Sequence, residues 1–589
     1  MKPVNLILIV LAGFTVSCSE PPKPVEPAPT QPESVSTTPT EKQVFFGDLH
    51  LHTALSVDAY ITNTRTMPDD AYRYAKGEAI EHVSGEMIQL QTPLDFMGVT
   101  DHAEMLGVAR AMSNAEDPLS DSDFAQDITS SEYERSHGAF RRLVSAAADG
   151  DVLGVVRMIN PIHARRAMRD TWEVIVEAAE AHNDPGKFTT FVAYEWTSMP
   201  QLSNLHRNVV FEGTNVPDMP FSSSDSNDPE DLWEFMDEWR EEGSDVLAIP
   251  HNSNASKGLM YPLEGLDGDP VDEEYAAARL RNEPITEITQ FKGTSETHPI
   301  LAPLDEFADF EIWNTTVGAP VVIDPVPGSY VRNAYQRGLS LEEEIGINPY
   351  EFGLIGSSDS HNSSTAVEEF NFTGGHGNAD DTPKTRLNSR ESTLTASSLN
   401  FSASGLAAVW AEENTRESLF AAMKRRETYA TSGTRIRLKF STSDGVPMGG
   451  RATVGEALPS FDIWAQQDAN SAPLDRVQVI KVTSSGESIV DVACSVGEPD
   501  PETQQCPSNG AGVNLESCEQ TGEGAAELKV SWQDEAFDSA QRTAYYVRVL
   551  ENPTCRWSTW DAIRIGQAIP ENRAATIQER AWSSPIWVN

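Results

Sequence analysis

Cysteine is scarce in this chain and is unevenly placed. Only 5 cysteines occur in 589 residues, and none lies between Cys18 and Cys494. The sequence also lacks a GxSxG motif, which argues against a serine nucleophile of the α/β-hydrolase type. Because Cys18 lies in a leader-like segment and the other cysteines lie near the C-terminus, we expect no catalytic cysteine either.

The C-terminal cysteines form an even set without any CxxC pair. In an oxidising compartment, an even set indicates two disulfides, and four cysteines allow three pairings. The sequence leaves all three pairings open. A zinc site is the alternative, but the spacing gives it little support. The disulfide candidates are Cys494, Cys506, Cys518 and Cys555.

Basic residues are also scarce in this chain compared with acidic ones. The chain has 43 basic and 90 acidic side chains, a formal net charge of -47 and a pI near 4.5. Such a field repels nucleic acid and anionic lipid, so we expect neither as a partner. A highly charged surface also keeps an exported protein soluble. An anionic substrate would need a locally positive site, which metal ions could supply.

Long apolar runs are missing as well. The run from Leu6 to Val16, preceded by Lys2, is too short to span a bilayer and is typical of a signal peptide. It ends in "TVSC", which resembles a bacterial lipobox with Cys18 as the lipidated residue. We therefore predict a signal peptide over 1–18 and a lipid-anchored protein of the cell envelope, facing the periplasm. A plain secretory signal is the alternative. Residues 19–43 are rich in proline, serine and threonine and predict a disordered tether.

Histidine is infrequent too, with 12 residues, yet half of them lie at the boundaries of apolar runs. Runs such as "PLDFMGVTDH", "KFTTFVAYEWT" and "DVLAIPHNS" turn polar at their C-terminal ends. Nearly continuous apolar runs are typical of strands in parallel sheets, and helix-like stretches separate them. The pattern predicts an α/β barrel or a doubly wound sheet. In a barrel, the C-terminal strand ends meet at one face, where chemistry collects.

The boundary residues form an ordered series of metal-binding side chains. Alternation along a strand points His50 and His52 to the same face. Imidazole and carboxylate together form the ligand set of zinc, manganese and iron, and the donors exceed the needs of one ion. We therefore expect two or three divalent ions. The series in chain order is His50, His52, Asp101, His102, Glu195, His206, His251 with Asn252, Asp359 and His361.

These motifs also carry a family resemblance. "GDLHLHTALSVD", "VTDH", a glutamate-bearing strand, "IPHN" and "SSDSH" resemble the PHP superfamily, named for polymerase and histidinol phosphatase. "FGDLHLHT", "EITQFKGTSE", "RRETYATSGTRI" and "ERAWSSPIWVN" resemble a bacterial family of unknown function, DUF3604, over roughly Val44 to Asn589. The resemblance implies a distorted seven-stranded β/α barrel of the PHP or TIM-like type, with insertions, over residues 44–430.

The resemblance also implies a role for each residue. His50, His52 and Asp359 would bind one ion, and Glu195 would bridge it to a second ion. Asp101 would orient a ligand from behind, and Asn252 stands where the family often has a second histidine. Glu287 matches a family glutamate that is expected to shape the barrel. The second ion would be completed by His206 and His251, and a third would be held by Asp58, His102 and His361.

The implied activity is that of a metal-dependent hydrolase acting on a small-molecule phosphate ester. Glu195 and Asp359 would be central to catalysis, because divalent ions lower the pKa of water. Lys292 is a candidate for holding an anionic substrate group, although a solvated loop lysine is the alternative, and Arg207 is a weaker candidate. Hydrolysis of a sulfate ester or an amide, or a non-catalytic surface lipoprotein with structural metals, are the other hypotheses. No pattern indicates an oligomeric state.

Beyond residue 430 the pattern changes. Short alternating segments such as "IRLKFSTS", "VQVIKVTS" and "AYYVRVLEN" are separated by glycine and proline. This alternation is typical of an antiparallel β-sandwich, which we predict for residues 431–589. Trp557 or Trp560 could bind carbohydrate there, but buried structural tryptophans are the simpler interpretation.

Overall fold

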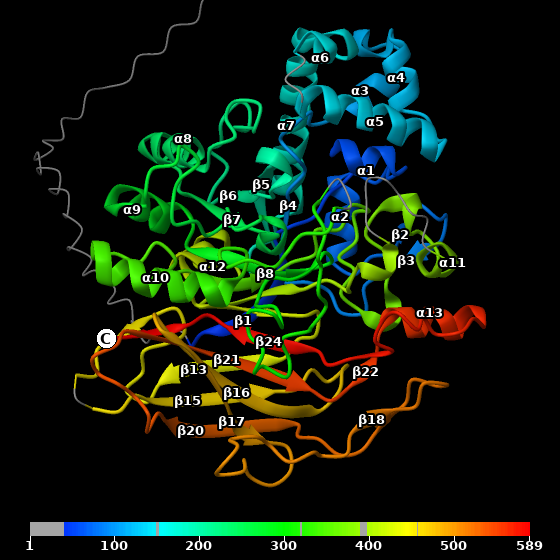
Figure 1. Ribbon diagram of the computed structural model, residues 1–589. Coiled ribbons are helices and arrows are strands. Elements are labelled where there is room, and N and C mark those ends of the chain that lie inside the picture. Colours follow the sequence, from blue (N-terminus) through cyan, green and yellow to red (C-terminus); the bar gives the residue numbers. More distant parts are fainter. Residues whose placement is uncertain (1–40, 149–151, 318–320, 389–396, 456) are drawn as a thin grey trace, which may run out of the picture. The chain divides into compact units, whose positions relative to one another are not determined.

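A mixed sheet of 13 strands forms the largest element of the computed structural model, which describes residues 41–148, 152–317, 321–388, 397–455 and 457–589 (Figure 1). The predicted leader, Cys18 and most of the predicted tether lie outside these residues. The strands are short and are buried on both faces in the first half of the sheet, as their continuous apolar runs indicate. The chain is therefore a mixed α/β protein.

Five strands carry the first half of the sheet, in the order β1-β4-β5-β6-β7. The first three run parallel to one another. Gly47 allows β1 to approach β4, because a β-carbon there would collide with the ring of Phe96. The strands are β1 (Gln43–Asp48), β4 (Phe96–Val99), β5 (Thr189–Trp196), β6 (Arg207–Phe211) and β7 (Val246–Pro250).

One of the runs expected in a parallel arrangement has the opposite direction. β6 pairs antiparallel with both β5 and β7. A fully apolar run such as "RNVVF" is buried equally well in either direction, so its composition does not fix its orientation. The direction matters for the site, because His206 precedes β6 and thus lies at the same edge as the C-terminal ends of β5 and β7.

A second, three-stranded sheet lies against the end of this series. β8 (Ile285–Gln290) pairs parallel with β10 (Gly353–Gly356) and antiparallel with β9 (Gly293–Thr294). The hydroxyl of Thr286 in β8 donates to the carbonyl of Pro250 in β7, at 2.9 Å. On the other side, Leu51 and Ser360 form an isolated parallel bridge, which places the chain after β10 beside the chain after β1.

Helices cover these strands. The long helix α7 packs on β4 and β5, α8 and α9 pack on β7, and α12 packs on β11 and β5. Four shorter helices between β4 and α7 share an apolar cluster with α1 (Figure 1). The bounds are α1 (Val57–Ile61), α2 (Pro68–Ala75), α3 (Val108–Ser113), α4 (Asp123–Ile128), α5 (Tyr133–Ala148), α6 (Val152–Met158), α7 (Pro161–His182), α8 (Pro229–Glu241), α9 (Glu273–Asn282), α10 (Val331–Ile345), α11 (Pro383–Leu387) and α12 (Arg416–Lys424). Among the described residues, no helix is long and apolar enough to cross a membrane.

The C-terminal strands continue the same large sheet. β11 pairs with β1, β12 with β11, and β24 with β12, and from there the ladder passes to β21 and β16. Residues Lys42–Asn589 accordingly form one compact unit. The bounds are β11 (Leu406–Ala411), β12 (Thr428–Thr431), β14 (Arg451–Ala452), β16 (Leu474–Thr483), β17 (Gly486–Cys494), β21 (Thr543–Glu551), β24 (Arg580–Ser583) and β25 (Ile586–Val588).

A separate antiparallel sheet of three strands packs near this part of the large sheet. Burial alternates along β13, as the sequence pattern predicts for a strand with one covered face. Its inward residues share one apolar cluster with Val479 and Val547 of β16 and β21. The three strands are β13 (Arg437–Thr442), β15 (Ser460–Gln466) and β20 (Glu527–Gln533), and helix α13 (Trp557–Ile565) follows later in the chain.

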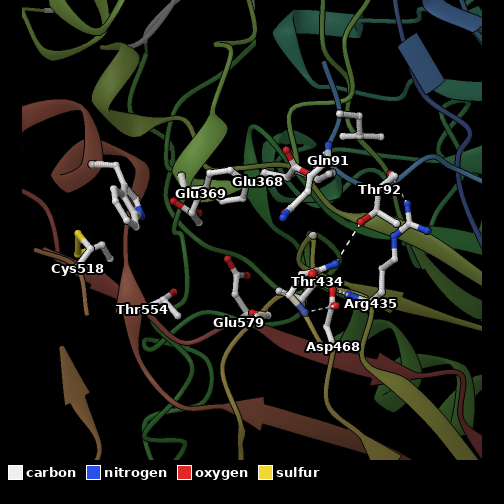
Figure 2. A pocket seen from close by; sticks show the side chains of 18 of the residues that line it. Gln91, Thr92, Glu368, Glu369, Thr434, Arg435, Asp468, Cys518, Thr554 and Glu579 are labelled. Carbon is white, nitrogen blue, oxygen red and sulfur yellow. Dashed lines mark hydrogen bonds between the residues drawn. A yellow bond between two sulfur atoms is a disulfide. The ribbon is translucent and has the colours of Figure 1, made fainter. Parts of the chain in front are cut away.

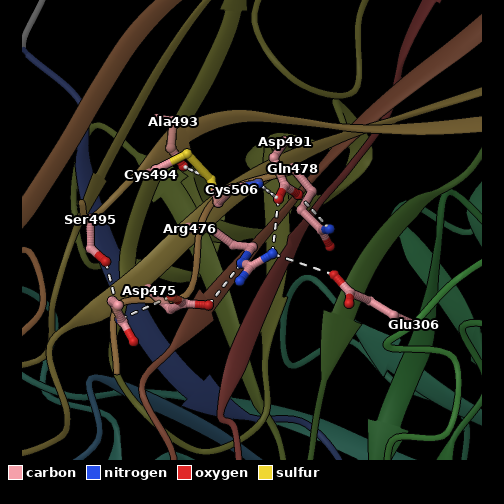
Figure 3. Close-up of a disulfide and its surroundings, with 10 residues drawn as sticks. Glu306, Asp475, Arg476, Gln478, Asp491, Ala493, Cys494, Ser495 and Cys506 are labelled. Carbon is pink, nitrogen blue, oxygen red and sulfur yellow. Dashed lines mark hydrogen bonds and ion pairs between the residues drawn. A yellow bond between two sulfur atoms is a disulfide. The ribbon is translucent and has the colours of Figure 1, made fainter. Parts of the chain in front are cut away.

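All four C-terminal cysteines are paired in disulfides. Cys518 bonds to Cys555 beside a cavity described below (Figure 2), and Cys494 at the end of β17 bonds to Cys506 (Figure 3). Near the second bond, the side chain of Arg476 pairs with Asp491, whose carboxylate accepts the backbone N–H of Cys506. The prediction of two disulfides is confirmed, and the structure selects one of the three pairings.

Trp557 is fully buried, and its indole N–H donates to the carbonyl of Phe401 at 2.9 Å. It is therefore a structural residue, as the simpler interpretation held. Trp560 is only partly buried and lines the cavity beside Cys518 and Cys555.

Candidate metal centre

The histidines that follow β1 owe their position to alternation along an extended segment. Leu49 and Leu51 are buried in apolar clusters, while the side chains of His50 and His52 point away from those clusters toward a group of carboxylates. The segment is held on one side by the backbone bond from His52 N to Ser360 O, at 2.8 Å. The alternation of side chains along this segment thus directs both imidazoles toward the same carboxylates.

Glu195 lies at the centre of this place. It sits near the end of β5 and is almost completely buried. Its Oε2 lies 3.3 Å from His50 Nε2 and 3.1 Å from His52 Nε2. Its Oε1 lies 2.7 Å from His206 Nδ1 and 3.2 Å from His251 Nε2. The two oxygens of one carboxylate therefore face two different pairs of imidazoles.

Asp359 completes the first group of donors. Its Oδ1 lies 3.2 Å from His50 Nε2 and 3.3 Å from His52 Nε2. Its Oδ2 instead meets the amide of Gln290 and the ammonium of Lys292. Asp359 has a φ of 56°, a left-handed backbone that is uncommon outside glycine. The sharp turn there lies directly after β10 and next to His50, whose carbonyl accepts the N–H of Asp359 at 2.7 Å.

A third group forms around Asp58 in α1. Its Oδ2 lies 3.2 Å from His102 Nε2 and 3.0 Å from His361 Nε2. His102 reaches this position because an isolated parallel bridge between His102 and Glu195 extends the β4–β5 pairing. The ring of His52 stacks between the other two imidazoles, with centroids 4.4 Å from His102 and 4.1 Å from His361.

Ligand atoms from these residues gather in three groups, each within 4.8 Å. His52 belongs to two of the groups, and so does Glu195. The groups are therefore not independent sites but a single connected centre. They consist of His50, His52 and Glu195; of Glu195, His206 and His251; and of His52, His102 and His361.

The electrostatics of the centre favour bound cations. Burial tends to raise the pKa of Glu195, but the imidazoles of His102 and His251 outweigh it and hold the pKa well below its usual range. Burial likewise tends to raise the pKa of Asp359, but His50 and Lys292 outweigh it and hold the pKa well below its usual range. Burial and neighbouring positive charge meanwhile lower the pKa of His251 to about 3. Burial lowers the pKa values of His50 and His102, but neighbouring carboxylates outweigh it and raise that of His102 to about 10 and that of His50 well above its usual range. The ionised carboxylates and the neutral His251 have the protonation states that metal ligands require, whereas His50 and His102 would lose a proton on binding an ion.

One nitrogen tests directly whether these residues fit a metal ion. His52 Nε2 is buried and makes no hydrogen bond within the described part of the chain, although two carboxylate oxygens lie 3.1 and 3.3 Å away. Both oxygens are within hydrogen-bond distance of the nitrogen, yet it forms a hydrogen bond with neither. Donors that converge on a point between them are arranged as ligands of an ion. The residues present therefore fit a divalent metal.

A surrounding layer of hydrogen bonds orients the imidazoles. His52 Nδ1 lies 3.0 Å from the hydroxyl of Ser56, which donates to Asp101 at 2.7 Å. Asp101 is thus linked to His52 through Ser56, an arrangement that can orient the imidazole. His50 Nδ1 lies 2.9 Å from Glu287, so this glutamate orients a candidate ligand in addition to its place on β8.

The remaining candidates from the sequence lie in different surroundings. Lys292 is buried and paired with Asp359, not solvated on a loop. Arg207 faces away from the centre and pairs with Glu283 at 2.9 Å. Asn252 is buried directly after His251, with a left-handed φ of 50°.

Sequence reasoning missed several neighbours of the centre. Gln290 at the end of β8 and Lys292 in the turn after it both contact Asp359, and their spacing of two was the available signal. His376 lies with its ring centroid 4.9 Å from that of His361, and its Nδ1 has no hydrogen-bond partner among the described residues. No carboxylate or second histidine stands beside His376 in the sequence, and so the pattern that marked the others did not mark it.

Comparisons with known proteins place the chain in a family without giving it an activity. A family model described as "Protein of unknown function (DUF3604)" matches residues 39–589. No curated protein matches the chain. A solved structure from Bacteroides vulgatus, a two-domain protein containing a predicted PHP-like metal-dependent phosphoesterase, is similar at 10% identity and a TM-score of 0.31, over 91% of this chain and 95% of that one. With the family model spanning nearly all described residues, this chain belongs to the DUF3604 family.

Proposed function

We propose that the protein is a metal-dependent hydrolase whose centre holds two or three divalent ions. The observation that carries this proposal is the position of Glu195, which offers one oxygen to His50 and His52 and the other to His206 and His251. A carboxylate shared in this way is suited to bridge two ions. Zinc, manganese and iron are the metals that this ligand set favours.

The proposed ligands are those named from the sequence. His50, His52, Glu195 and Asp359 would hold one ion, and Glu195, His206 and His251 a second. Asp58, His102 and His361 would hold a third, near His52. Ions bound there would supply an activated water and withdraw charge from substrate oxygens.

The side chains around the ligands keep them in place for this chemistry. Glu287 fixes which nitrogen of His50 carries the proton, because it accepts from Nδ1 and leaves Nε2 to face Glu195 and Asp359. Ser56 and Asp101 fix the ring of His52 in the same way. Lys292 and Gln290 hold Oδ2 of Asp359, which directs Oδ1 toward the imidazoles.

The charge balance favours an anionic substrate. Three ionised carboxylates, Asp58, Glu195 and Asp359, face the centre, and their pKa values lie well below the usual range. With Asp101 and Glu287 behind the ligands the carboxylates number five, so two divalent ions with Lys292 balance their charge and three ions with Lys292 exceed it. With three ions the centre would be locally positive in a chain of net charge -47. A small phosphate ester fits this environment better than a neutral amide, while nucleic acid is disfavoured by the surrounding field.

The finer fold assignments belong to the same proposal. We take β1, β4, β5, β6, β7, β8 and β10 to be the strands of a distorted seven-stranded barrel. The contact between β7 and β8 and the bridge between Leu51 and Ser360 support it. The alternating C-terminal strands would form a sandwich-like region, and the two disulfides favour an exported protein. Lipid attachment at Cys18 would anchor it in the cell envelope.

A hydrolysis screen of metal-loaded protein tests the proposed activity. Phosphomonoesters, phosphodiesters, sulfate esters and amides would be compared, with His52→Ala as the inactive reference. His163→Ala, which alters a histidine outside the centre, is the matched control. Turnover of a phosphate ester that needs His52 but not His163 supports the proposal. Turnover confined to sulfate esters or amides would reassign the substrate, and two or three bound ions without any turnover would indicate structural metals.

A further inference from the structure

A cavity with acidic side chains in its walls lies apart from the metal centre. It has a volume of about 160 Å³ and contains none of the candidate ligands. Its walls come from the segment around Thr92, the short helix that begins at Glu369, the turn around Thr434 and the disulfide between Cys518 and Cys555 (Figure 2). Segments from both halves of the chain therefore build it.

Two glutamates project into this cavity from opposite walls. Figure 2 shows the carboxylates of Glu369 and Glu579 turned toward one another. Glu369 is 8% exposed and Glu579 is 2% exposed. One oxygen of Glu369 accepts the N–H of Trp557, and one oxygen of Glu579 accepts the hydroxyl of Ser432. Glu369 Oε1 has no partner among the described residues, although it is buried.

Neither carboxylate has a basic partner. No lysine, arginine or histidine nitrogen of the described residues lies within 4.0 Å of either group. The nearest arginine in sequence to Trp557, Arg556, is occupied by both oxygens of Glu311 at 2.8 and 2.7 Å. A buried carboxylate without a counter-ion is costly unless it takes up a proton or meets a cation.

We propose that this cavity binds a small organic cation through a primary ammonium group, held between Glu369 and Glu579. An ammonium group carries three N–H donors. The hydroxyl oxygens of Thr434 and Thr554 line the same space and can accept from it (Figure 2). A quaternary ammonium ion has no such donors and would instead need an aromatic cage. Of the described lining residues only Trp560 and Phe370 are aromatic, which is too few for such a cage, and Arg435 is the one cation among them.

The geometry argues against a metal ion at this place. Within the described chain, no group of three histidine, cysteine or acidic ligand atoms gathers within 4.8 Å outside the metal centre. A divalent cation of the calcium type would need six to eight oxygen ligands at close range. The cavity also exceeds the size of a single ion, since space for one water takes roughly 10–15 Å³ on the same measure.

Protonation is the alternative way to relieve the buried charge, and it makes a prediction of its own. Burial raises the pKa of Glu579 to about 8, with further contributions from neighbouring carboxylates, and raises that of Glu369 well above its usual range. A bound ammonium ion requires the ionised form, so its affinity should grow as pH rises toward 8. The other charged groups that face this pair are Glu311, Glu368, Asp468, Glu551, Arg435, Arg556 and Arg580.

Calorimetric titration of the whole protein with 2-aminoethanol tests the proposal. Ethylene glycol is the matched neutral probe, because it differs by a hydroxyl in place of the ammonium. We expect saturable binding of the amine and binding of the glycol weaker by about tenfold or more, which corresponds to about 1.4 kcal/mol. Glu369→Gln and Glu579→Gln should each weaken the binding of 2-aminoethanol by a similar factor. Glu535→Gln, at an exposed position, should leave this affinity unchanged.

Elemental analysis of the two variants should find the same metal content as in the unaltered protein, because the cavity contains no candidate ligand. If a variant fails to fold, the unaltered protein still decides the matter. Its amine affinity should rise with pH below pH 8, by about tenfold per pH unit for each carboxyl group that must lose its proton. Equal binding of ethylene glycol or glucose would overturn the proposal in favour of a neutral polyol. Tighter binding of calcium would indicate a metal site, and absence of binding by every probe would leave protonated carboxyls as the explanation.

Discussion

Two buried clusters of charged side chains differ in how their polar atoms are satisfied. In the metal centre, His52 Nε2 is buried without a hydrogen bond in the described chain, as are His206 Nε2 and His251 Nδ1. The second cluster joins Glu296 and Asp305 to Arg332 and Arg548. There, each carboxylate oxygen meets at least one N–H or O–H donor at 3.2 Å or less.

The arginine network is a structural device that connects the two halves of the chain. Arg548 in β21 lies 2.7 Å from Asp305, and Trp582 in β24 donates to Glu296 at 2.7 Å. Arg332 in α10 pairs with both carboxylates, at 2.7 and 2.9 Å. Because a guanidinium group presents several N–H donors in one plane, two arginines satisfy two carboxylates without outside help.

This contrast distinguishes a candidate binding site from a structural ion-pair network. Buried charges are tolerated when they are paired and hydrogen-bonded, which the arginine network achieves by itself. The metal centre achieves it only in part. His52 Nε2 lies near two carboxylate oxygens without a hydrogen bond, and His206 and His251 each contact Glu195 through one ring nitrogen while the other has no partner among the described residues. A buried nitrogen left without a hydrogen bond beside carboxylates, such as His52 Nε2, indicates an ion, whereas complete pairing indicates a structural role. The following predictions test this distinction, starting from the largest expected effect.

Loss of a ligand should abolish hydrolysis and remove metal. His52→Ala and Asp359→Ala delete donors that share one group, so the ion there loses much of its coordination. The loss in turnover should exceed the ~10²–10³ that one hydrogen-bond donor is typically worth. Elemental analysis and steady-state kinetics measure both effects, with circular dichroism to confirm folding. A folded His52→Ala protein with full metal content and normal turnover would contradict the metal assignment.

Loss of an arginine from the arginine network should instead lower the stability of the fold. Arg548→Met leaves Glu296 and Asp305 undercompensated, and breaking a buried pair typically costs about 3–5 kcal/mol. Urea denaturation measures the change in the free energy of unfolding, and Arg437→Met on an exposed strand position is the control, with an expected change within about 0.5 kcal/mol. The folded variant should keep its full metal content. Metal loss at equal stability would show that the two clusters are not distinct in role.

Removing an orienting group should have an intermediate effect on the metal centre. Glu287→Gln keeps the shape of the side chain but weakens its hold on His50 Nδ1. Groups behind metal ligands are typically worth about 10–100-fold in metal affinity or activity. Competition with a chelator of known affinity measures the metal affinity. Glu234→Gln on the exposed side of α8 is the matched control. Unchanged affinity would leave Glu287 as a residue of the barrel wall alone.

Loss of Lys292 should have the smallest effect of the four. Lys292→Ala removes one of two groups on Asp359 Oδ2, and Gln290 remains. We expect a decrease of about tenfold, at the low end of the range for such supporting groups. If Lys292 also contacts substrate, most of the decrease should appear as a higher KM. Lys187→Ala at an exposed position is the control, and a Lys292→Ala protein as inactive as His52→Ala would make the lysine part of the reacting machinery.

The candidate centre was largely predictable from the sequence, and its surroundings were not. Alternation along a strand decided that His50 and His52 share a face, because the side-chain period of two is a local property of the backbone. The even number of cysteines near the C-terminus predicted two disulfides. The residue types at the ends of the apolar runs predicted metal chemistry, because few other arrangements use so many imidazoles with carboxylates.

Only the tertiary structure decided which groups meet across the chain. The direction of β6, the pairing of Cys494 with Cys506, the contact of Lys292 with Asp359 and the hold of Glu287 on His50 all join residues far apart in sequence. The ion pair between Arg548 and Asp305 is likewise a contact between residues far apart in sequence. Burial and periodicity fix what a segment looks like locally, but pairing depends on distances in space. Those distances are set only when the strands from both halves of the chain join one sheet.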